Sequence, residues 1–167
     1  MRESFELARS APCHFDSTGT WKIWCDGACA PTNPGPCAWG ALVESPSGER
    51  TEHCGYIQAN GTNNIAELTA ALEALRLVPM HAEVILCSDS QYMLRGLGEW
   101  APRWLSNDWC RSKKGKPVAN KDLWKKLYSE YSTRKVTLRW VRGHNGHPEN
   151  ERADKLAGRG LKLAAST

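Results

Sequence analysis

The stretch AEVILCSDS, residues 82–90, constrains the fold of this chain more than any other part of the sequence. Residues 84–87 form a continuous apolar run, which is typical of a strand buried on both faces of a sheet. A sheet that contains such a strand needs helices on both of its sides. The run therefore favours an α/β architecture.

The patterns around this strand predict the order of the other elements. Residues 21–29 alternate and are rich in aromatic and β-branched side chains, which indicates a strand. Apolar residues at helical spacing between Ile65 and Val78 predict a helix that Pro79 ends. The expected strands are 21–29, 38–45, 49–58, 82–90 and 135–141, and the expected helices are 63–78, 90–97, a stretch containing Trp100 and Trp104, 120–132 and 148–165. This order implies a five-stranded mixed sheet, with three antiparallel strands and then two parallel to the first, and helices on both faces.

Length and composition favour one domain without a membrane segment. The 167 residues fit one domain over residues 21–165, preceded by a loosely ordered extension at residues 1–20. The sequence has no run of about 18 apolar residues, so we expect no membrane span. The seven cysteines are scattered without a CxxC pair, which favours free thiols in a reducing cytoplasm.

Positive charge is concentrated in one part of the chain. Residues 95–135 contain eleven Lys or Arg and four Asp or Glu, whereas the whole chain has a net charge of only +4. A concentrated basic segment on a near-neutral body is typical of a protein that binds a polyanion. The alternative is a solvated helix face without a partner.

Two carboxylates fall where strands of the predicted sheet end. Asp26 lies near the end of the first strand, and Asp89 lies where the buried apolar strand ends. If these strands are parallel neighbours, the two carboxylates lie side by side, because such strand ends face a common crevice. Adjacent carboxylates stay ionised only beside a cation, and oxygen ligands suit Mg²⁺ or Mn²⁺.

Each acidic residue also has an explanation that involves no metal. Asp26 could serve a turn with Gly27, and Asp89 could cap the following helix. Asn64 and Glu67 form a capping-box variant, and Asp154 could be a solvated charge on the last helix. The sequence alone leaves both sets of explanations open.

Five motifs together resemble bacterial ribonuclease H of type 1. They are DGAC…NPGP…G (26–40), TNNIAEL (62–68), SDSQY (88–92), KPVANKDLW (116–124) and GHNGHPENERAD (143–154). They occur in the family's order and span residues 21 to about 160. The resemblance implies a ribonuclease H-like fold and an endonuclease that hydrolyses the RNA strand of RNA–DNA hybrids, leaving 5′-phosphate and 3′-hydroxyl ends.

The resemblance also implies the catalytic groups. Four metal-binding carboxylates correspond to Asp26, Glu67, Asp89 and Asp154, and a loop histidine that assists proton transfer or product release corresponds to His144. Two Mg²⁺ ions would bind with the substrate, and Mn²⁺ could replace them. His147 is better explained as the cap of the last helix, because Pro148 follows it.

The resemblance further implies which residues contact the hybrid. The minor groove, where the 2′-hydroxyls lie, would be lined by Cys29, Asn33, Asn63, Asn64 and Gln91. Thr62 and Asn120 would hold a phosphate of the DNA strand, and the basic segment 95–126 would form a protruding handle. The remaining substrate contacts expected in this handle are Trp100, Trp109, Lys113, Lys114 and Lys116, with Trp104 assigned to its internal core.

Three departures from the family bear on hybrid binding. Leu105 and Ser106 stand where many bacterial members have lysines, and Asp108 adds a negative charge, which predicts weaker binding and a shallower salt dependence. One extra residue before Pro34 leaves the position of Asn33 open.

Three other functions compete with a free-standing, monomeric hybrid nuclease. The chain could be a hybrid-binding module without activity, or a DNA nuclease with the same fold. It could also be a domain from a reverse transcriptase, although the starting methionine and the extension favour a separate protein.

Overall fold

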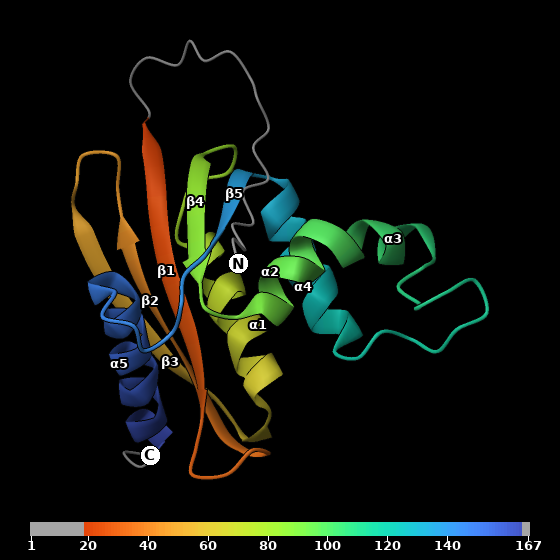
Figure 1. The fold of residues 1–167 in the computed structure, drawn as a ribbon, viewed down its shortest axis with the longest axis horizontal. Helices are drawn as coiled ribbons and strands as arrows, with labels where there is room; N and C mark the ends of the chain where they lie inside the picture. Colours follow the sequence, from red (N-terminus) through yellow and green to blue (C-terminus); the bar gives the residue numbers. More distant parts are fainter. Residues whose placement is uncertain (1–18, 165–167) are drawn as a thin grey trace.

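The computed structural model describes residues 19–164, which form one mixed sheet with helices packed against it (Figure 1). In chain order the elements are β1 (Thr20–Cys29), β2 (Gly35–Glu44), β3 (Arg50–Gly61), α1 (Asn63–Arg76), β4 (Glu83–Ser88), α2 (Gln91–Arg95), the π-helical segment η1 (Gly96–Trp100), α3 (Ala101–Ser106), α4 (Lys121–Ser132), β5 (Lys135–Trp140) and α5 (Pro148–Leu163). The extension expected at residues 1–20 lies outside the described residues, apart from its last two positions. No helix within residues 19–164 is both long and apolar enough to cross a membrane.

The sheet has the topology that the sequence predicts. Its strand order is β3-β2-β1-β4-β5, with β1 antiparallel to β2 and parallel to β4. In the register of the parallel pair, Trp24 lies opposite Cys87. Asp26 and Asp89 each follow two residues later, so the pairing brings both carboxylates to the same end of the sheet.

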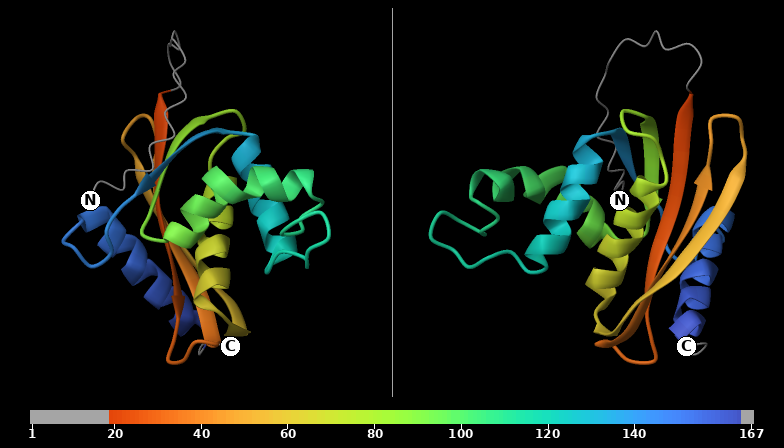
Figure 2. Two further views of the ribbon diagram at one scale, coloured as in Figure 1. Left: turned by 45° about the vertical axis from the view of Figure 1, so that its right-hand side comes forward. Right: turned by 180° about the vertical axis from the view of Figure 1, so that it is seen from behind.

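Helices cover both faces of the sheet, with α1 and α4 on one side and α5 on the other (Figure 2). The apolar run of β4 explains this arrangement. Val84 and Leu86 are buried in the cluster on the α1 side, and Cys87 is buried in a second cluster together with Ala153 of α5. The prediction that this strand is buried on both faces is confirmed.

The starts of α1 and α5 test two predicted helix caps. α1 begins after Thr62, whose hydroxyl oxygen accepts a hydrogen bond from the Ile65 amide at 3.2 Å. The capping box built on Asn64 is therefore wrong, because Thr62 is the extended residue before the helix and Asn64 is already helical. At α5 the prediction is confirmed: His147 Nδ1 accepts from the Asn150 amide at 3.3 Å, and Pro148 opens the helix.

A protrusion made of residues 95–126, the handle, extends from the α1 side of the sheet (Figure 1). Two separate helices were expected at its base, but α2, η1 and α3 follow one another without a break. The aromatic rings of the handle pack on α4: Trp124 makes edge contacts with Tyr92 and Trp104, and its indole N–H donates to the Tyr92 hydroxyl at 3.0 Å. These rings belong to the same core cluster as residues of the sheet.

The structure corrects the expected role of Trp109. Its side chain is only 4% exposed and its ring packs against Tyr128, so it is a core residue rather than one that stacks on the substrate. The cause is local, because the chain turns back through left-handed conformations at Asp108 and Trp109. Trp104, assigned to the core, is partly buried there, and Trp100 is also partly exposed.

Candidate active site

The site begins with Asp26 on β1, which α1 approaches closely. The Asp26 carboxylate accepts a hydrogen bond from the Gly27 amide at 2.9 Å. A Cβ atom at Gly27 would lie 2.5 Å from the backbone nitrogen of Glu67, so a larger residue here would push α1 away. Glycine at this position therefore lets α1 deliver Glu67 to Asp26.

Three carboxylates meet at this point. Asp26, Glu67 and Asp89 each offer an oxygen, and these oxygens lie within 4.8 Å of one another. Asp154 does not join this group in the described structure. Its charge nevertheless raises the pKa of Asp26 and of Asp89, so α5 holds it close enough to act on the site.

Burial and mutual repulsion favour the protonated forms of these acids. Burial first, and then the charge of Asp89, raise the pKa of Asp26 to about 7. Burial and the charges of Asp26 and Asp89 raise the pKa of Glu67 well above its usual range. Burial also raises the pKa of Asp89, although a hydrogen bond from Asn150 and the charge of His144 oppose the rise. Among residues 19–164, the positive charge that acts on the site is therefore too weak to offset burial and repulsion.

A divalent cation fits this donor set. Glu67 Oε2 is buried and has no hydrogen-bond partner among the described residues, so it is an acceptor that a cation could satisfy. The group consists of oxygen donors alone, which Mg²⁺ and Mn²⁺ prefer. A cation would supply the charge that the clustered carboxylates lack.

The helix caps explain none of these acids. Ser90, not Asp89, caps α2, and its hydroxyl oxygen accepts from the Met93 amide at 3.2 Å. Asp26 lies within β1 rather than in a turn, and Glu67 lies beyond the first turn of α1. The structural alternatives that the sequence left open for these three residues are wrong.

The loop between β5 and α5 supports Asp89 from the other side. The Trp140 indole N–H donates to the Asp89 carbonyl at 3.2 Å. A Cβ atom at Gly143 would lie 2.6 Å from Asp89 Oδ2, so glycine makes room for the carboxylate. The sequence pattern did not single out Trp140; the only signal was its place at the end of β5, opposite Ser88.

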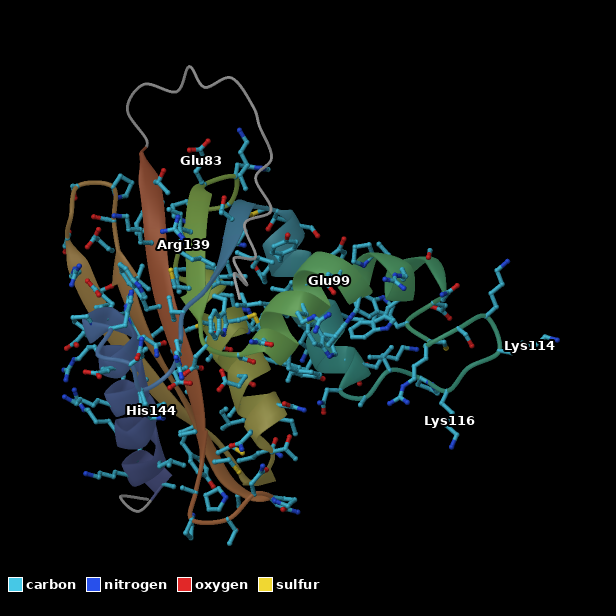
Figure 3. All side chains as sticks on the ribbon, viewed as in Figure 1. Glu83, Glu99, Lys114, Lys116, Arg139 and His144 are labelled. Carbon is cyan, nitrogen blue, oxygen red and sulfur yellow. The ribbon has the colours of Figure 1, made fainter. Side chains whose placement is uncertain are left out.

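His144 lies in the same loop. It is exposed and has a positive φ of 52°, between Gly143 and Gly146. Its effect on the pKa of Asp89 places it near the carboxylates. In Figure 3 it lies next to α5, far from the lysines at the tip of the handle.

The residues expected to contact substrate form two groups. Around the start of α1, the Asn33 side-chain oxygen accepts from the Asn63 amide at 3.2 Å, which joins the loop before β2 to the helix. Asn33, Asn63 and Asn64 are exposed, whereas Cys29, Thr62 and Gln91 are partly buried. This contact indicates where Asn33 lies despite the extra residue in its loop.

The second group belongs to the handle. Lys113, Lys114 and Lys116 are exposed, and Figure 3 shows the last two projecting from its outer loop. Asn120 adopts a left-handed conformation directly before α4 and is partly exposed.

A mixed α/β sheet that clusters three acidic side chains, with a basic protrusion beside it, combines a candidate divalent-cation site with a surface suited to a polyanion. The RNase H family model matches residues 19–162. The chain belongs to the RNase H family, and it is an endonuclease of the hydrolase class.

Two curated relatives illustrate the similarity. Ribonuclease H of Coxiella burnetii (strain Dugway 5J108-111) is 47% identical over 139 residues, which cover 83% of this chain and 88% of that protein. Ribonuclease H of Cupriavidus pinatubonensis is 46% identical over 144 residues, covering 86% and 97%.

Solved structures show the same fold. LC9-RNase H1, described as a type 1 RNase H with the type 2 active-site motif, superposes with a TM-score of 0.77 at 27% identity, covering 90% of this chain and 75% of that one. LC11-RNase H1, solved in complex with an RNA/DNA hybrid, has a TM-score of 0.63 at 24% identity, covering 87% and 99%.

Proposed function

We propose that this chain hydrolyses the RNA strand of RNA–DNA hybrids with two divalent ions, leaving 5′-phosphate and 3′-hydroxyl ends. The observation that carries the proposal is the group of Asp26, Glu67 and Asp89, in which Glu67 Oε2 is buried without a partner. Membership of the RNase H family and the relatives named Ribonuclease H support the substrate.

The carboxylates would have different roles as ligands of the ions. Asp26 of β1 interacts with both Glu67 and Asp89, so it is the residue that would bind both ions. Glu67 and Asp89 would complete the group, and Asp154 of α5, whose charge already acts on Asp26 and Asp89, would serve as the fourth ligand. Bound ions of this kind supply positive charge to the attacking water and the leaving oxygen.

His144 handles a proton in this proposal. A histidine imidazole can both accept and donate a proton near neutral pH. On its exposed loop the ring can approach the leaving 3′-oxygen or the departing phosphate. The magnesium assignment follows from the oxygen donors, and Mn²⁺ would serve the same ligands.

The start of α1 would select the RNA strand. Asn33, Asn63 and Asn64 are exposed amides that can both donate to and accept from a 2′-hydroxyl. Cys29 and Gln91, both partly exposed, would contribute further contacts to the RNA strand. The Thr62 oxygen already accepts from the Ile65 amide, which leaves the hydroxyl hydrogen to donate to a DNA phosphate, with Asn120 as the second contact.

The handle would bind the duplex through charge. Lys113, Lys114 and Lys116 are exposed, so they can neutralise phosphates of the DNA strand. Trp100 remains the aromatic candidate for a sugar contact. We also propose that the protein acts as a monomer in the cytoplasm, where the six described cysteines, all free thiols, would stay reduced.

The decisive experiment offers end-labelled RNA–DNA hybrid, single-stranded DNA and double-stranded DNA to the purified protein, with Mg²⁺, with Mn²⁺ or with EDTA. We expect cleavage of the RNA strand alone, and only with a divalent ion. Binding without cleavage at every metal concentration would indicate a binding module, and cleavage of DNA would indicate a different nuclease.

Two variants separate the residues' roles in the same assay. Asp89→Asn should abolish cleavage while circular dichroism shows an intact fold, and a wild-type rate would refute the metal assignment. His144→Ala should slow turnover and leave measurable activity. End analysis of the products with a phosphatase and a ligase tests the 5′-phosphate and 3′-hydroxyl assignment.

A further inference from the structure

Two cysteines face each other across β1 and β2, directly beside the surface assigned to the RNA strand. Cys29 is paired with Cys37 in the antiparallel register. The next pair joins the Ala30 amide to the Pro36 carbonyl at 3.1 Å, so the alternation makes Cys29 and Cys37 a non-hydrogen-bonded pair. Such pairs have Cα atoms about 4.5 Å apart, which lies within the range that a disulfide spans.

The two thiols point into the same small space. Cys29 Sγ donates to the Gly35 carbonyl at 3.7 Å, and Cys37 Sγ donates to the same oxygen at 3.4 Å. Burial, and then a hydrogen bond and charge interaction with the Cys29 side chain, raise the pKa of Cys37 to about 12. A shared acceptor and a direct interaction place the sulfur atoms close together.

The surroundings of the two thiols differ. Cys37 is fully buried, whereas Cys29 is partly exposed. An oxidant in solution therefore reaches Cys29 first. Cys37 lies behind it, where its sulfur can attack Cys29 once Cys29 has been oxidised.

We propose that Cys29 and Cys37 form an oxidisable dithiol that closes to a disulfide on exposure to a peroxide and thereby weakens hybrid binding. Cys29 sulfur attacks one peroxide oxygen, the O–O bond breaks, and a sulfenic acid and one water form. Cys37 sulfur then displaces the sulfenic oxygen, which leaves as a second water with the Cys37 proton. Two thiols and one hydrogen peroxide thus become one disulfide and two waters.

The dithiol is linked to hybrid binding by the hydrogen bonds that the reduced thiols donate to nearby backbone carbonyls. The single S–H of Cys29 also has the Thr32 carbonyl within reach at 3.2 Å and the Gly61 carbonyl at 3.4 Å. The S–H of Cys37 also has the Thr62 carbonyl within reach at 3.5 Å. These carbonyls belong to the loop before β2, to the end of β3 and to the residue that caps α1.

A disulfide has no S–H group, so oxidation removes both thiol donors at once. The same junction is where the Asn33 oxygen meets the Asn63 amide. Loosening it changes the spacing of the exposed amides that would contact the 2′-hydroxyls. This effect rests on the proposed function, whereas formation of the disulfide does not.

The test compares the reduced and the peroxide-treated protein in two measurements. Peptide mass mapping under non-reducing conditions should show a Cys29–Cys37 linkage that dithiothreitol removes. Fluorescence anisotropy with labelled hybrid, in Ca²⁺ to prevent cleavage, should show that Kd rises about tenfold on oxidation, which corresponds to about 1.4 kcal/mol. Dithiothreitol should restore the original Kd.

Variants separate this pair from the other cysteines. Cys37→Ser and Cys37→Ala should keep the same Kd with and without peroxide, because no partner remains for Cys29. Cys54→Ser removes a partly exposed thiol of β3 and should respond to peroxide like the parent. Peptide mass mapping of the parent protein shows whether the Cys29–Cys37 disulfide forms, even if neither Cys37 variant folds.

Three results would overturn the proposal: absence of the Cys29–Cys37 peptide, a linkage that leaves Kd unchanged, or a Cys37→Ser variant whose Kd still responds to peroxide. If the reduced protein does not bind hybrid at all, the proposed function fails instead. The mass map still reports whether the dithiol closes.

Discussion

Replacing Asp26 with asparagine should stabilise the metal-free protein while abolishing its activity. The Asp26 carboxyl has a folded-state pKa of about 7 against an ordinary value of 3.8, because burial and Asp89 oppose its charge. Asparagine has nearly the same shape, keeps the oxygen that accepts from the Gly27 amide, and carries no charge. The variant therefore removes repulsion without removing a contact.

The sign and size of the effect follow from proton linkage. Because the folded pKa is raised, the folded state binds the extra proton, and ionisation costs stability as pH rises from about 4 to 7. A rise of about three pKa units corresponds to roughly 4 kcal/mol at one unit per 1.36 kcal/mol. Since neighbouring acids share the protons, we expect Asp26→Asn to gain about 2–4 kcal/mol at pH 8.

Urea unfolding in EDTA at pH 4, 6 and 8 measures this difference. The gap between variant and parent should be small at pH 4 and widest at pH 8, and Mg²⁺ should narrow it by binding the parent. Asp108→Asn is the matched control, because Asp108 is exposed and its left-handed backbone tolerates asparagine. A gap that is independent of pH, or a variant less stable than the parent at pH 8, would refute the reasoning.

Three further outcomes test other parts of the structure. Gly143→Ala puts a Cβ atom 2.6 Å from Asp89 Oδ2, so kcat should fall about 100-fold, as for a displacement of about 1 Å, with the fold retained by circular dichroism; an unchanged kcat would contradict this. Trp109→Ala should lower the free energy of unfolding by about 3–5 kcal/mol in urea, whereas Leu105→Ala, at an exposed position, should change it little. Lys114→Ala should reduce the log–log salt slope of hybrid binding by roughly 0.9, and an unchanged slope would remove Lys114 from the interface.

The sequence predicted the sheet because its signals were strong and local. The apolar run of β4 and the alternation in β1 specified buried strands, and parallel pairing then put Asp26 and Asp89 at one end of the sheet. The position of Glu67 could not be predicted from local sequence patterns, because its contact with Asp26 depends on how closely α1 packs on Gly27. That approach is a tertiary property, and only the family resemblance anticipated the result.

The errors arose where several residues compete for one role. Thr62 and Asn64 are both good helix caps, and the extended backbone at Thr62 decides between them. Trp100, Trp104 and Trp109 look alike in sequence, but the left-handed turn at Asp108 and Trp109 buries only the last of them. The sequence does not reveal the extended backbone at Thr62 or the left-handed backbone at Asp108 and Trp109. A left-handed turn is usually recognised by a glycine, and neither Asp108 nor Trp109 is one.

The handle is not a detachable accessory. Trp124 of α4 contacts Tyr92 and Trp104 and fills the space that a Cβ atom at Gly96 would take, so the root of the protrusion is part of the central core. Grafting residues 95–120 alone onto another scaffold would separate Trp104 from Trp124 and expose the Trp104 ring to water. A transplanted handle must therefore include α4.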